Sequence, residues 1–145
     1  MPKPTKILFT GGGTAGHIFP IIAIVREIRK RYSSESLEIF YIGPKDEFED
    51  ILLGEGIKVK TILAGKIRRY FKFKAFFQNL IDILFKIPIG FLQALFYVFF
   101  ISPDLIFSKG GYGSLPAVLA GWILIVPIFL HESDISPGFA NRLAG

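Results

Sequence analysis

Short apolar runs bounded by glycine and proline alternate along the chain with segments of helical periodicity. The runs predict strands over residues 7–10, 37–42, 57–63, 104–108 and 127–130. The periodic segments predict helices over residues 17–31, 46–53 and 114–124, with a further helix beginning near Ser136. Strands that alternate with helices form a parallel sheet covered on both faces. The pattern therefore predicts an α/β fold, a Rossmann-like parallel sheet with helices on both faces.

A different pattern fills residues 71–100, which contain nine of the 16 phenylalanines. Six apolar residues recur there at helical spacing and form one stripe: Phe73, Phe76, Phe77, Leu80, Ile81 and Leu84. Six cations and one carboxylate, Asp82, lie in residues 66–86, and this segment accounts for the whole net charge of +5. Cations beside a Phe/Leu stripe suit a helix in the interface of an anionic bilayer. The alternative is an ordinary helix that packs its stripe on the sheet and leaves its cations solvated.

Residues 87–103 carry no charge, and this raises a transmembrane helix as a hypothesis. A run of 17 residues is at the short limit of about 17–25 for a span, and this one contains Pro88, Gly90 and Gln93. A buried or interfacial helix fits better, so we expect the protein to lie on the membrane and not to span it. The expected membrane-contacting residues are Arg68, Arg69, Phe71, Lys72, Phe73, Phe76, Phe77 and Leu80.

Composition adds limits on fold and location. A chain of 145 residues is long enough for one domain with its own core. Apolar residues make up 51% of it and charged residues 20%, which excludes an intrinsically disordered protein. The absence of cysteine excludes disulfides and thiolate metal sites. The N-terminus lacks the long apolar core and cleavage pattern of a signal peptide, so we expect the protein to stay on the cytoplasmic side.

A glycine-rich turn, Gly-Gly-Gly-Thr-Ala-Gly-His at residues 11–17, joins the first predicted strand to a helix. Glycines let the backbone approach a ligand, and a helix N-terminus offers free N–H groups, so phosphate or diphosphate is the natural ligand. The same glycines satisfy the dinucleotide fingerprint G-x-G-x-x-G. The second strand is not followed by the carboxylate that would bind the ribose, because Asp46 and Glu47 fall in the next predicted helix. Dinucleotide binding is therefore disfavoured.

A second turn, Ser-Lys-Gly-Gly-Tyr-Gly-Ser at residues 108–114, repeats this architecture. Two such turns at the carboxyl ends of parallel strands would form neighbouring anion sites. The alternative is that both are only tight turns between strand and helix. That alternative accounts for the glycines, but explains less well the polar residues that flank them, Thr14, His17, Tyr112 and Ser114.

The two histidines, His17 and His131, both lie where a predicted strand ends or a helix begins. Ligands bind at this edge of a parallel sheet, which favours a functional role for both. His17 could act as a general base, because the unperturbed pKa of histidine lies near the working pH. No cluster has the spacing of metal ligands.

Four motifs, in this order, resemble the MurG family of N-acetylglucosaminyltransferases over essentially the whole chain. They are Phe-Thr-Gly-Gly-Gly-Thr-Ala-Gly-His at 9–17, Gly-Lys-Ile-Arg-Arg-Tyr-Phe at 65–71, Ser-Lys-Gly-Gly-Tyr at 108–112, and His-Glu-Ser-Asp at 131–134 followed by Pro-Gly-Phe-Ala-Asn-Arg at 137–142. Each motif alone is modest, and their shared order and spacing make the resemblance specific.

The resemblance implies the N-terminal half of a GT-B glycosyltransferase, with the active site in the cleft between two Rossmann-like domains. This half would bind the undecaprenyl-diphosphate-linked MurNAc-pentapeptide acceptor at the cytoplasmic face of the membrane, as a peripheral protein. A C-terminal domain, without a counterpart in this chain, would bind most of UDP-GlcNAc. Catalysis would be inverting and would transfer GlcNAc to a MurNAc hydroxyl. We expect no cofactor, no metal and no nucleic-acid partner, and an anionic membrane surface as a further partner.

Carried over by position, the resemblance makes His17 the catalytic base. The substrate-binding residues that it implies are Gly12, Gly13, Thr14, Ala15, Gly16, Gly110, Gly111, Tyr112, Ser114, His131, Glu132 and Asp134. Three positions depart from the family pattern: Asp134 stands where many members have asparagine, Ala15 where glycine is frequent, and Gly113 where valine is common. The first departure puts the donor contact of residue 134 in doubt.

An alternative function is that of a stand-alone subunit which recruits acceptor at the membrane for a separate donor-binding chain. The sequence stops inside the helix predicted near Ser136, which suggests a fragment or a truncated reading frame. A reading frame that continues past Gly145 into a second α/β domain would favour the two-domain enzyme, and a stop codon there would favour the subunit.

Overall fold

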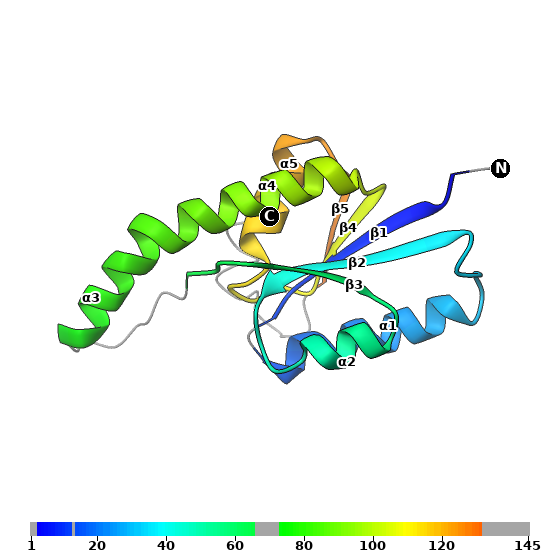
Figure 1. The fold of residues 1–145 in the computed structure, drawn as a ribbon, viewed down its shortest axis with the longest axis horizontal. Coiled ribbons are helices and arrows are strands. Elements are labelled where there is room, and N and C mark those ends of the chain that lie inside the picture. The colour runs from blue at the N-terminus through cyan, green and yellow to red at the C-terminus, as the bar shows by residue number, and fades with distance from the viewer. Residues whose placement is uncertain (1–2, 13, 66–72, 132–145) are drawn as a thin grey trace.

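A five-stranded parallel sheet forms the centre of the molecule, in the strand order β3-β2-β1-β4-β5 (Figure 1). The computed structural model describes residues 3–12, 14–65 and 73–131. The strands are β1 (Thr5–Thr10), β2 (Leu37–Pro44), β3 (Lys58–Ile62), β4 (Leu105–Ser108) and β5 (Ile128–Leu130). The helices are α1 (Ala15–Arg29), α2 (Glu49–Gly54), α3 (Phe73–Ile81), the π-helix η1 (Asp82–Lys86), α4 (Ile87–Ile101) and α5 (Leu115–Ile123). The predicted fold class and all five predicted strands are confirmed.

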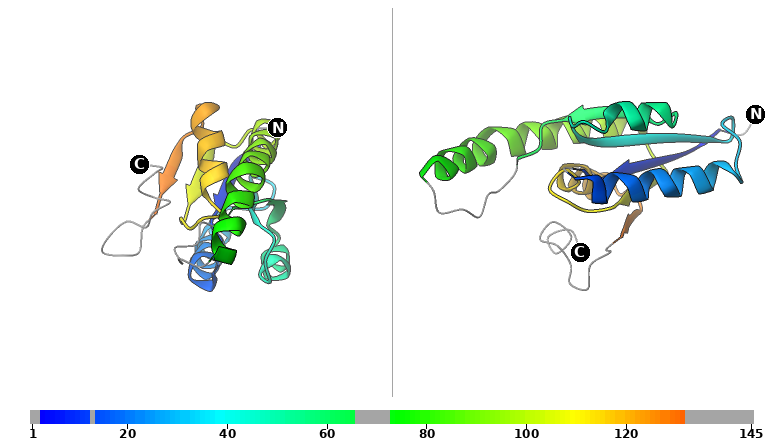
Figure 2. Two further views of the ribbon diagram at one scale, coloured as in Figure 1. Left: turned by 90° about the vertical axis from the view of Figure 1, so that its left-hand side faces the viewer. Right: turned by 90° about the horizontal axis from the view of Figure 1, so that it is seen from below.

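Helices cover both faces of the sheet, α1 and α2 on one and α4 and α5 on the other (Figures 1 and 2). Because side chains alternate along a strand, the inner strands β1, β2 and β4 contribute to two cores. Leu8 of β1 packs in the core under α4 and α5, whereas Phe9 packs in the core over α1. Both side chains are almost fully buried. This double burial explains why the strands are near-continuous apolar runs in the sequence.

Two predicted helices begin at other residues than expected. The helix expected over 17–31 is α1, which starts and ends two residues earlier. The helix expected over 46–53 is α2, so the placement of Asp46 and Glu47 inside it was wrong. Asp46 instead accepts a hydrogen bond from the Phe48 backbone N–H through Oδ1, at 3.0 Å, which closes a turn before α2. The helix expected near Ser136 lies outside the described residues.

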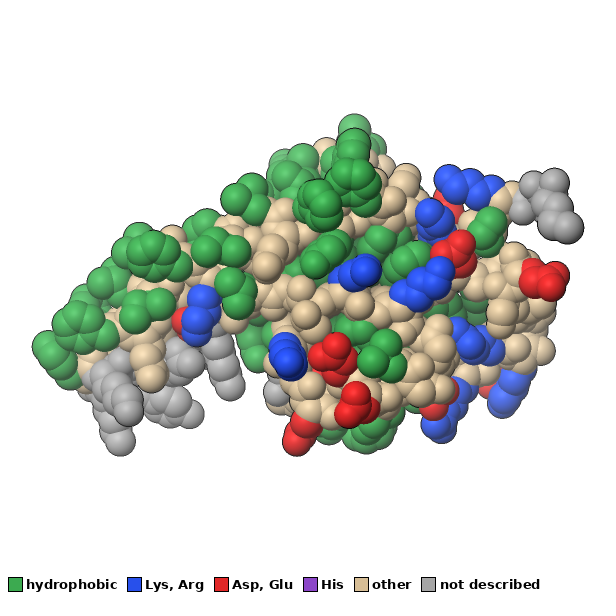
Figure 3. Space-filling model, in the orientation of Figure 1, with side chains coloured by type: hydrophobic (Ala, Val, Ile, Leu, Met, Phe, Trp, Pro, Cys, Tyr) green, Lys and Arg blue, Asp and Glu red, His purple; other side chains and the backbone are tan. Residues whose placement is uncertain are grey.

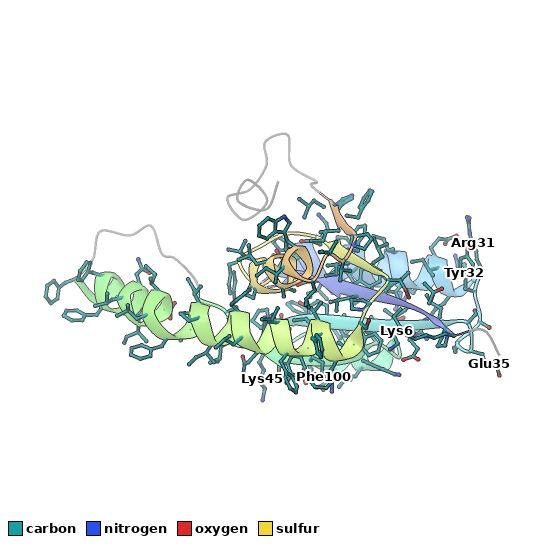
Figure 4. The ribbon with its side chains drawn as sticks, turned by 90° about the horizontal axis from the view of Figure 1, so that it is seen from above. Lys6, Arg31, Tyr32, Glu35, Lys45 and Phe100 are labelled. Atoms are coloured by element: carbon teal, nitrogen blue, oxygen red, sulfur yellow. The ribbon has the colours of Figure 1, made fainter. Side chains whose placement is uncertain are left out.

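The segments α3, η1 and α4 follow one another without a break, and α4 is fixed to the sheet at both ends. At its start, Gly90 lies against the carbonyl of Leu63, and Gln93 Oε1 accepts a hydrogen bond from the Leu63 N–H at 2.8 Å. At its end, the Lys6 ammonium donates to the Ile101 carbonyl at 2.9 Å. The positive charge is stabilised there by the negative end of the helix dipole. Lys6 and the end of α4 are seen together in Figure 4.

The first half of this long helix projects past the edge at which the strands end, here called the carboxyl edge (Figures 1 and 2). All six residues of the predicted stripe are exposed, from 42% for Leu80 to 81% for Phe73. The alternative in which the stripe packs on the sheet was therefore wrong. Within η1, Asp82 is buried and forms an ion pair with Lys86 at 2.7 Å.

Candidate functional site

The first glycine turn connects β1 to α1 at the carboxyl edge. Gly11 and Gly12 are buried, and Gly12 has φ +115°, a conformation that favours glycine. Thr14 then occupies the N-cap position of α1 without a side-chain capping bond, and Ala15 is the first helical residue. Ala15 is not among the described residues with positive φ, so the turn tolerates its methyl group. Gly13 lies outside the described residues.

The second glycine turn connects β4 to α5 and has two consecutive residues in the left-handed region, Gly110 at φ 89° and Gly111 at φ 87°. Its ends are tied down by polar side chains. Ser114 Oγ donates to the Gly111 carbonyl at 2.8 Å, and Ser108 Oγ accepts from the Gly110 N–H at 3.3 Å. The turn is therefore a fixed element of the fold.

The two turns lie side by side because β1 and β4 are neighbours in the sheet. A methyl group built on Gly111 would lie 2.8 Å from the Gly12 carbonyl oxygen and 3.1 Å from Nε2 of His17. The half-buried His17 imidazole thus lies at the junction of both turns. The expectation that the turns are neighbours on one edge is confirmed, and His17 belongs to both of them.

Thr14 holds the other side of the imidazole. Its Oγ1 lies 2.7 Å from Nδ1 of His17, three residues along the chain, and the threonine itself is exposed. The ring therefore has its Nδ1 on the first turn and its Nε2 towards the second. This orientation points Nε2 towards Gly111, where the two turns meet.

A buttress that sequence reasoning missed, Tyr41 and Pro44, supports both turns from the end of β2. The Tyr41 hydroxyl donates to the Gly11 carbonyl at 2.9 Å, and burial raises the pKa of this phenol far above its usual range, so it stays a donor. The Pro44 ring lies 3.2 Å from the position of a methyl group on Gly12 and also contacts Gly113. The partners of these contacts lie about thirty residues apart in the chain for Gly11 and Gly12 and about seventy for Gly113. No local sequence pattern predicts them.

The end of β5 brings His131 beside the second turn. Its backbone N–H donates to the Ser108 carbonyl at 2.8 Å, and its ring stacks on Phe107 with 5.9 Å between centroids. Its Nδ1 is buried and has no hydrogen-bond partner among the described residues. Lys109 in the second turn is also buried, which the sequence did not predict. The remaining expected residues at this end, Glu132 and Asp134, lie outside the described part of the chain.

The overhanging helix α3 carries the expected membrane-contacting residues that the structure describes: Phe73, Phe76, Phe77 and Leu80. Apolar side chains follow this helix and α4 across the molecule (Figure 3). Between the two helices, Lys86 forms an ion pair with the buried Asp82. The expected partners Arg68, Arg69, Phe71 and Lys72 lie outside the described residues. The segment Phe76–Ile101 is long and apolar enough to cross a membrane by length and composition. Its second half, however, packs on the sheet through Ala94 and Val98.

Metal binding finds no support in residues 3–12, 14–65 and 73–131, where no three His, Asp or Glu side chains come together in a possible metal site.

Comparison with known proteins then decides the family. Residues 7–145 match the model of the glycosyltransferase family 28 N-terminal domain. The chain belongs to this family. A curated relative from Legionella pneumophila (strain Corby) is 43% identical over 140 residues, which are 96% of this chain and 36% of the relative. It is named UDP-N-acetylglucosamine--N-acetylmuramyl-(pentapeptide) pyrophosphoryl-undecaprenol N-acetylglucosamine transferase.

A relative of the same name from Streptococcus pyogenes serotype M3 is 42% identical over 144 residues, covering 97% of this chain and 38% of the relative. This chain thus spans little more than a third of the length of these two relatives. The crystal structure of Acinetobacter baumannii MurG superposes with a TM-score of 0.73 at 22% identity, covering 97% of this chain and 38% of that one. This likeness confirms the fold, and the resemblance drawn from the four motifs is confirmed by the relatives.

Proposed function

We propose that this chain is the acceptor-binding, N-terminal part of an inverting glycosyltransferase that moves GlcNAc from UDP-GlcNAc to lipid-linked MurNAc-pentapeptide. The observation that carries the proposal is the convergence of both glycine turns on His17. The names of the relatives supply the identity of donor and acceptor. A donor-binding domain would complete the enzyme, and the chain joined to such a domain is called the two-domain protein below.

The two turns suit the diphosphate of the acceptor. Each turn ends at the N-terminus of a helix, α1 or α5, where free N–H groups and the helix dipole favour an anion. Gly12 and Gly110 are buried, whereas the half-buried Gly111 leaves the backbone of the second turn open to close approach. The other proposed contacts on the described part of the edge are Thr14, Ala15, Gly16, Tyr112, Ser114 and His131.

His17 would act as the general base. Its Nε2 takes the proton of the attacking MurNAc hydroxyl while the hydroxyl oxygen forms a bond to the anomeric carbon of GlcNAc. The bond from that carbon to the diphosphate breaks, and UDP leaves with the electron pair. Attack from the face opposite the leaving group inverts the anomeric centre. The half-buried position of His17 between the turns supports this role, because both turns suit a diphosphate.

The overhanging helix would hold the site against the cytoplasmic face of the membrane. The exposed stripe on α3 continues past the carboxyl edge, so an apolar surface and the glycine turns lie at the same end of the molecule (Figure 1). A lipid-linked substrate has its diphosphate at the membrane surface, which matches this arrangement. Cations in residues 66–86 add attraction to anionic lipids, about 1 kcal/mol for each near the surface.

The test of the catalytic role is His17→Ala in the two-domain protein, assayed with UDP-GlcNAc and a lipid-linked acceptor. We expect kcat to fall by roughly 10²–10⁴-fold, because a positioned base contributes that much. The matched comparison is His131→Gln, which we expect to act mainly on KM through substrate binding. Turnover like that of the unchanged protein in His17→Ala would remove His17 from the role of base. An assay of the chain mixed with a separately produced donor domain distinguishes the split-subunit alternative, which requires full activity without a covalent link.

The test of membrane docking is co-sedimentation with vesicles that contain anionic phosphatidylglycerol. We expect binding at low salt and release at high salt, because screening weakens the attraction. Phe73→Ser with Phe76→Ser should weaken binding by more than about 10-fold, since burying each phenylalanine contributes roughly 1.5–3 kcal/mol. Tyr32→Ser is the matched control, because Tyr32 is a similarly exposed aromatic residue at the opposite end of the molecule (Figure 4). Equal binding of all three proteins would contradict the docking surface.

A further inference from the structure

The hydroxyl of Thr14 is not used as an N-cap hydroxyl ordinarily is. A threonine at this position normally accepts a hydrogen bond from a backbone N–H in the first turn of its helix. Thr14 has the extended backbone of an N-cap, φ −152° and ψ 156°, but its side chain makes no capping bond to α1. Oγ1 lies 2.7 Å from Nδ1 of His17 instead. The fold therefore gives this hydroxyl to the imidazole and not to the helix.

The contact between Thr14 and His17 allows two arrangements of protons. The hydroxyl can donate to an unprotonated Nδ1, in which case a neutral ring carries its proton on Nε2. Alternatively, a protonated Nδ1 donates to the hydroxyl oxygen, and the lone pair of the neutral ring is on Nε2. Only the second arrangement leaves a base at Nε2, the nitrogen that faces Gly111.

An anion at the first turn selects between these arrangements. An oxygen of a phosphate or diphosphate accepts hydrogen bonds, so a hydroxyl in contact with it donates its proton to that oxygen. The Thr14 oxygen is then left as an acceptor for Nδ1–H. Thr14 is exposed at the N-terminus of the fifteen-residue helix α1, where the proposed diphosphate would lie.

We propose that Thr14 is a positioning residue that couples binding of the diphosphate to the tautomer of His17. This inference rests on the proposed function. When the anion binds, the hydrogen-bond chain runs from Nδ1–H to the Thr14 oxygen and from the Thr14 hydroxyl to the anion. Nε2 becomes the acceptor, ready to take the proton of the attacking hydroxyl, and the ring becomes imidazolium as that proton arrives. Binding of the acceptor diphosphate thus puts His17 in the tautomer that can accept the proton of the attacking hydroxyl.

The direct test is the protonation of the His17 ring in the two-domain protein, followed by NMR after labelling with ¹⁵N-histidine. His17→Gln assigns the signals, and inorganic pyrophosphate serves as the anion. We expect pyrophosphate to shift the neutral ring towards the form with a proton on Nδ1 and an unprotonated Nε2. In Thr14→Val, which keeps the shape but lacks the hydroxyl, pyrophosphate should leave the tautomer unchanged. A proton that stays on Nε2 with pyrophosphate bound, or the same shift in Thr14→Val, overturns the inference.

Kinetics give a second readout. We expect Thr14→Val to lower kcat by roughly 10–10²-fold, less than the loss expected from removing the base itself. Thr14→Ser keeps the hydroxyl and should restore most of the turnover. Thr5→Val is the matched control, because Thr5 is exposed at the other end of β1, and it should leave turnover unchanged. Equal turnover of Thr14→Val and Thr14→Ser overturns the coupling. It leaves the proposed function intact as long as His17→Ala is inactive.

Discussion

Gly111 is the residue on which the contact between the two turns depends, and Gly111→Ala is the sharpest test of it. The substitution adds one methyl group at a residue with φ 87°. The methyl carbon would lie 2.8 Å from the Gly12 carbonyl oxygen and 3.1 Å from His17 Nε2. The nearest obstacle is backbone of the neighbouring turn, so it cannot rotate away as a flexible side chain can.

The expected cost has two parts. A non-glycine residue held in the left-handed region costs of order 1–3 kcal/mol. Forcing an extra methyl group into packed structure typically costs another 1–3 kcal/mol. A total of about 3 kcal/mol follows if the turns relax in part. For a chain of 145 residues, each kcal/mol shifts Tm by roughly 3–4 °C, so we expect Tm to fall by about 10 °C.

Thermal unfolding followed by circular dichroism measures this loss, and two glycines serve as controls. Gly54, in α2, has no atom within 4 Å of an added methyl group, so Gly54→Ala should raise stability by up to about 1 kcal/mol. Gly56 has φ 69°, but its nearest neighbour is the guanidinium of Arg29. Gly56→Ala therefore reports mainly the backbone strain, and its Tm should lie between the other two.

Catalysis should suffer more than stability in Gly111→Ala. The methyl group displaces His17 from the shared space, and turnover of the two-domain protein should fall even at temperatures where the variant is folded. Equal Tm values for the variants at Gly111 and Gly54 would refute the claim that the turns touch. A lower Tm with unchanged turnover would refute the claim that His17 works at their junction.

Two further predictions concern the rest of the fold. Gly90→Ala would drive a methyl group into the carbonyl of Leu63, so we expect the free energy of unfolding in urea to fall by about 1–3 kcal/mol, whereas Gly54→Ala does not lower it. Hydrogen bonds from Lys58 and Arg26 lower the pKa of Glu38 and of Glu55, respectively, below the ordinary value of a glutamate carboxyl. The stability that these pairs contribute is therefore complete above about pH 4.5 and is lost as pH falls through the lowered pKa values. Tm measured from pH 6 to pH 3 should fall more in the unchanged chain than in the double variant Glu38→Gln, Glu55→Gln, and parallel curves would contradict the assignment.

The sheet could be predicted from the sequence because its signals are local. The inner strands are apolar runs that end at glycine, proline or a polar residue, because burial on two faces requires such runs. The edge strand β3 alternates instead, with Lys58 and Lys60 exposed. The adjacency of the glycine turns followed from topology alone, since parallel strands end at one edge. The orientation of the His17 ring could not be predicted from the sequence. It depends on a 2.7 Å contact between Thr14 Oγ1 and His17 Nδ1, which another rotamer of either side chain would not make.

The long helix shows where local signals mislead. Pro88, Gly90 and Gln93 counted against a membrane span in the sequence, and each has a place in a continuous helix. Pro88 is the second residue of α4, just after the π-helix η1, so its missing N–H falls where the helix changes its hydrogen-bond pattern. Gly90 and Gln93 bind the end of β3. Gly90 and Gln93 weaken a helix prediction from the sequence, but in the fold they supply contacts to Leu63.

Gly113, which departs from the family pattern, is explained by a contact with Pro44, a residue distant in the sequence. Valine is common there in the MurG family, yet a side chain on Gly113 would collide with the Pro44 ring and would come within 2.8 Å of the Gly11 carbonyl oxygen. Pro44 fills the space that a valine would need, and it also packs against Gly12. Pro44, the last residue of β2, therefore restricts position 113 in the second turn to a residue without a side chain. Because this restriction fixes the spacing of the two turns around His17, the end of β2 belongs to the site even though it contributes no group to the chemistry.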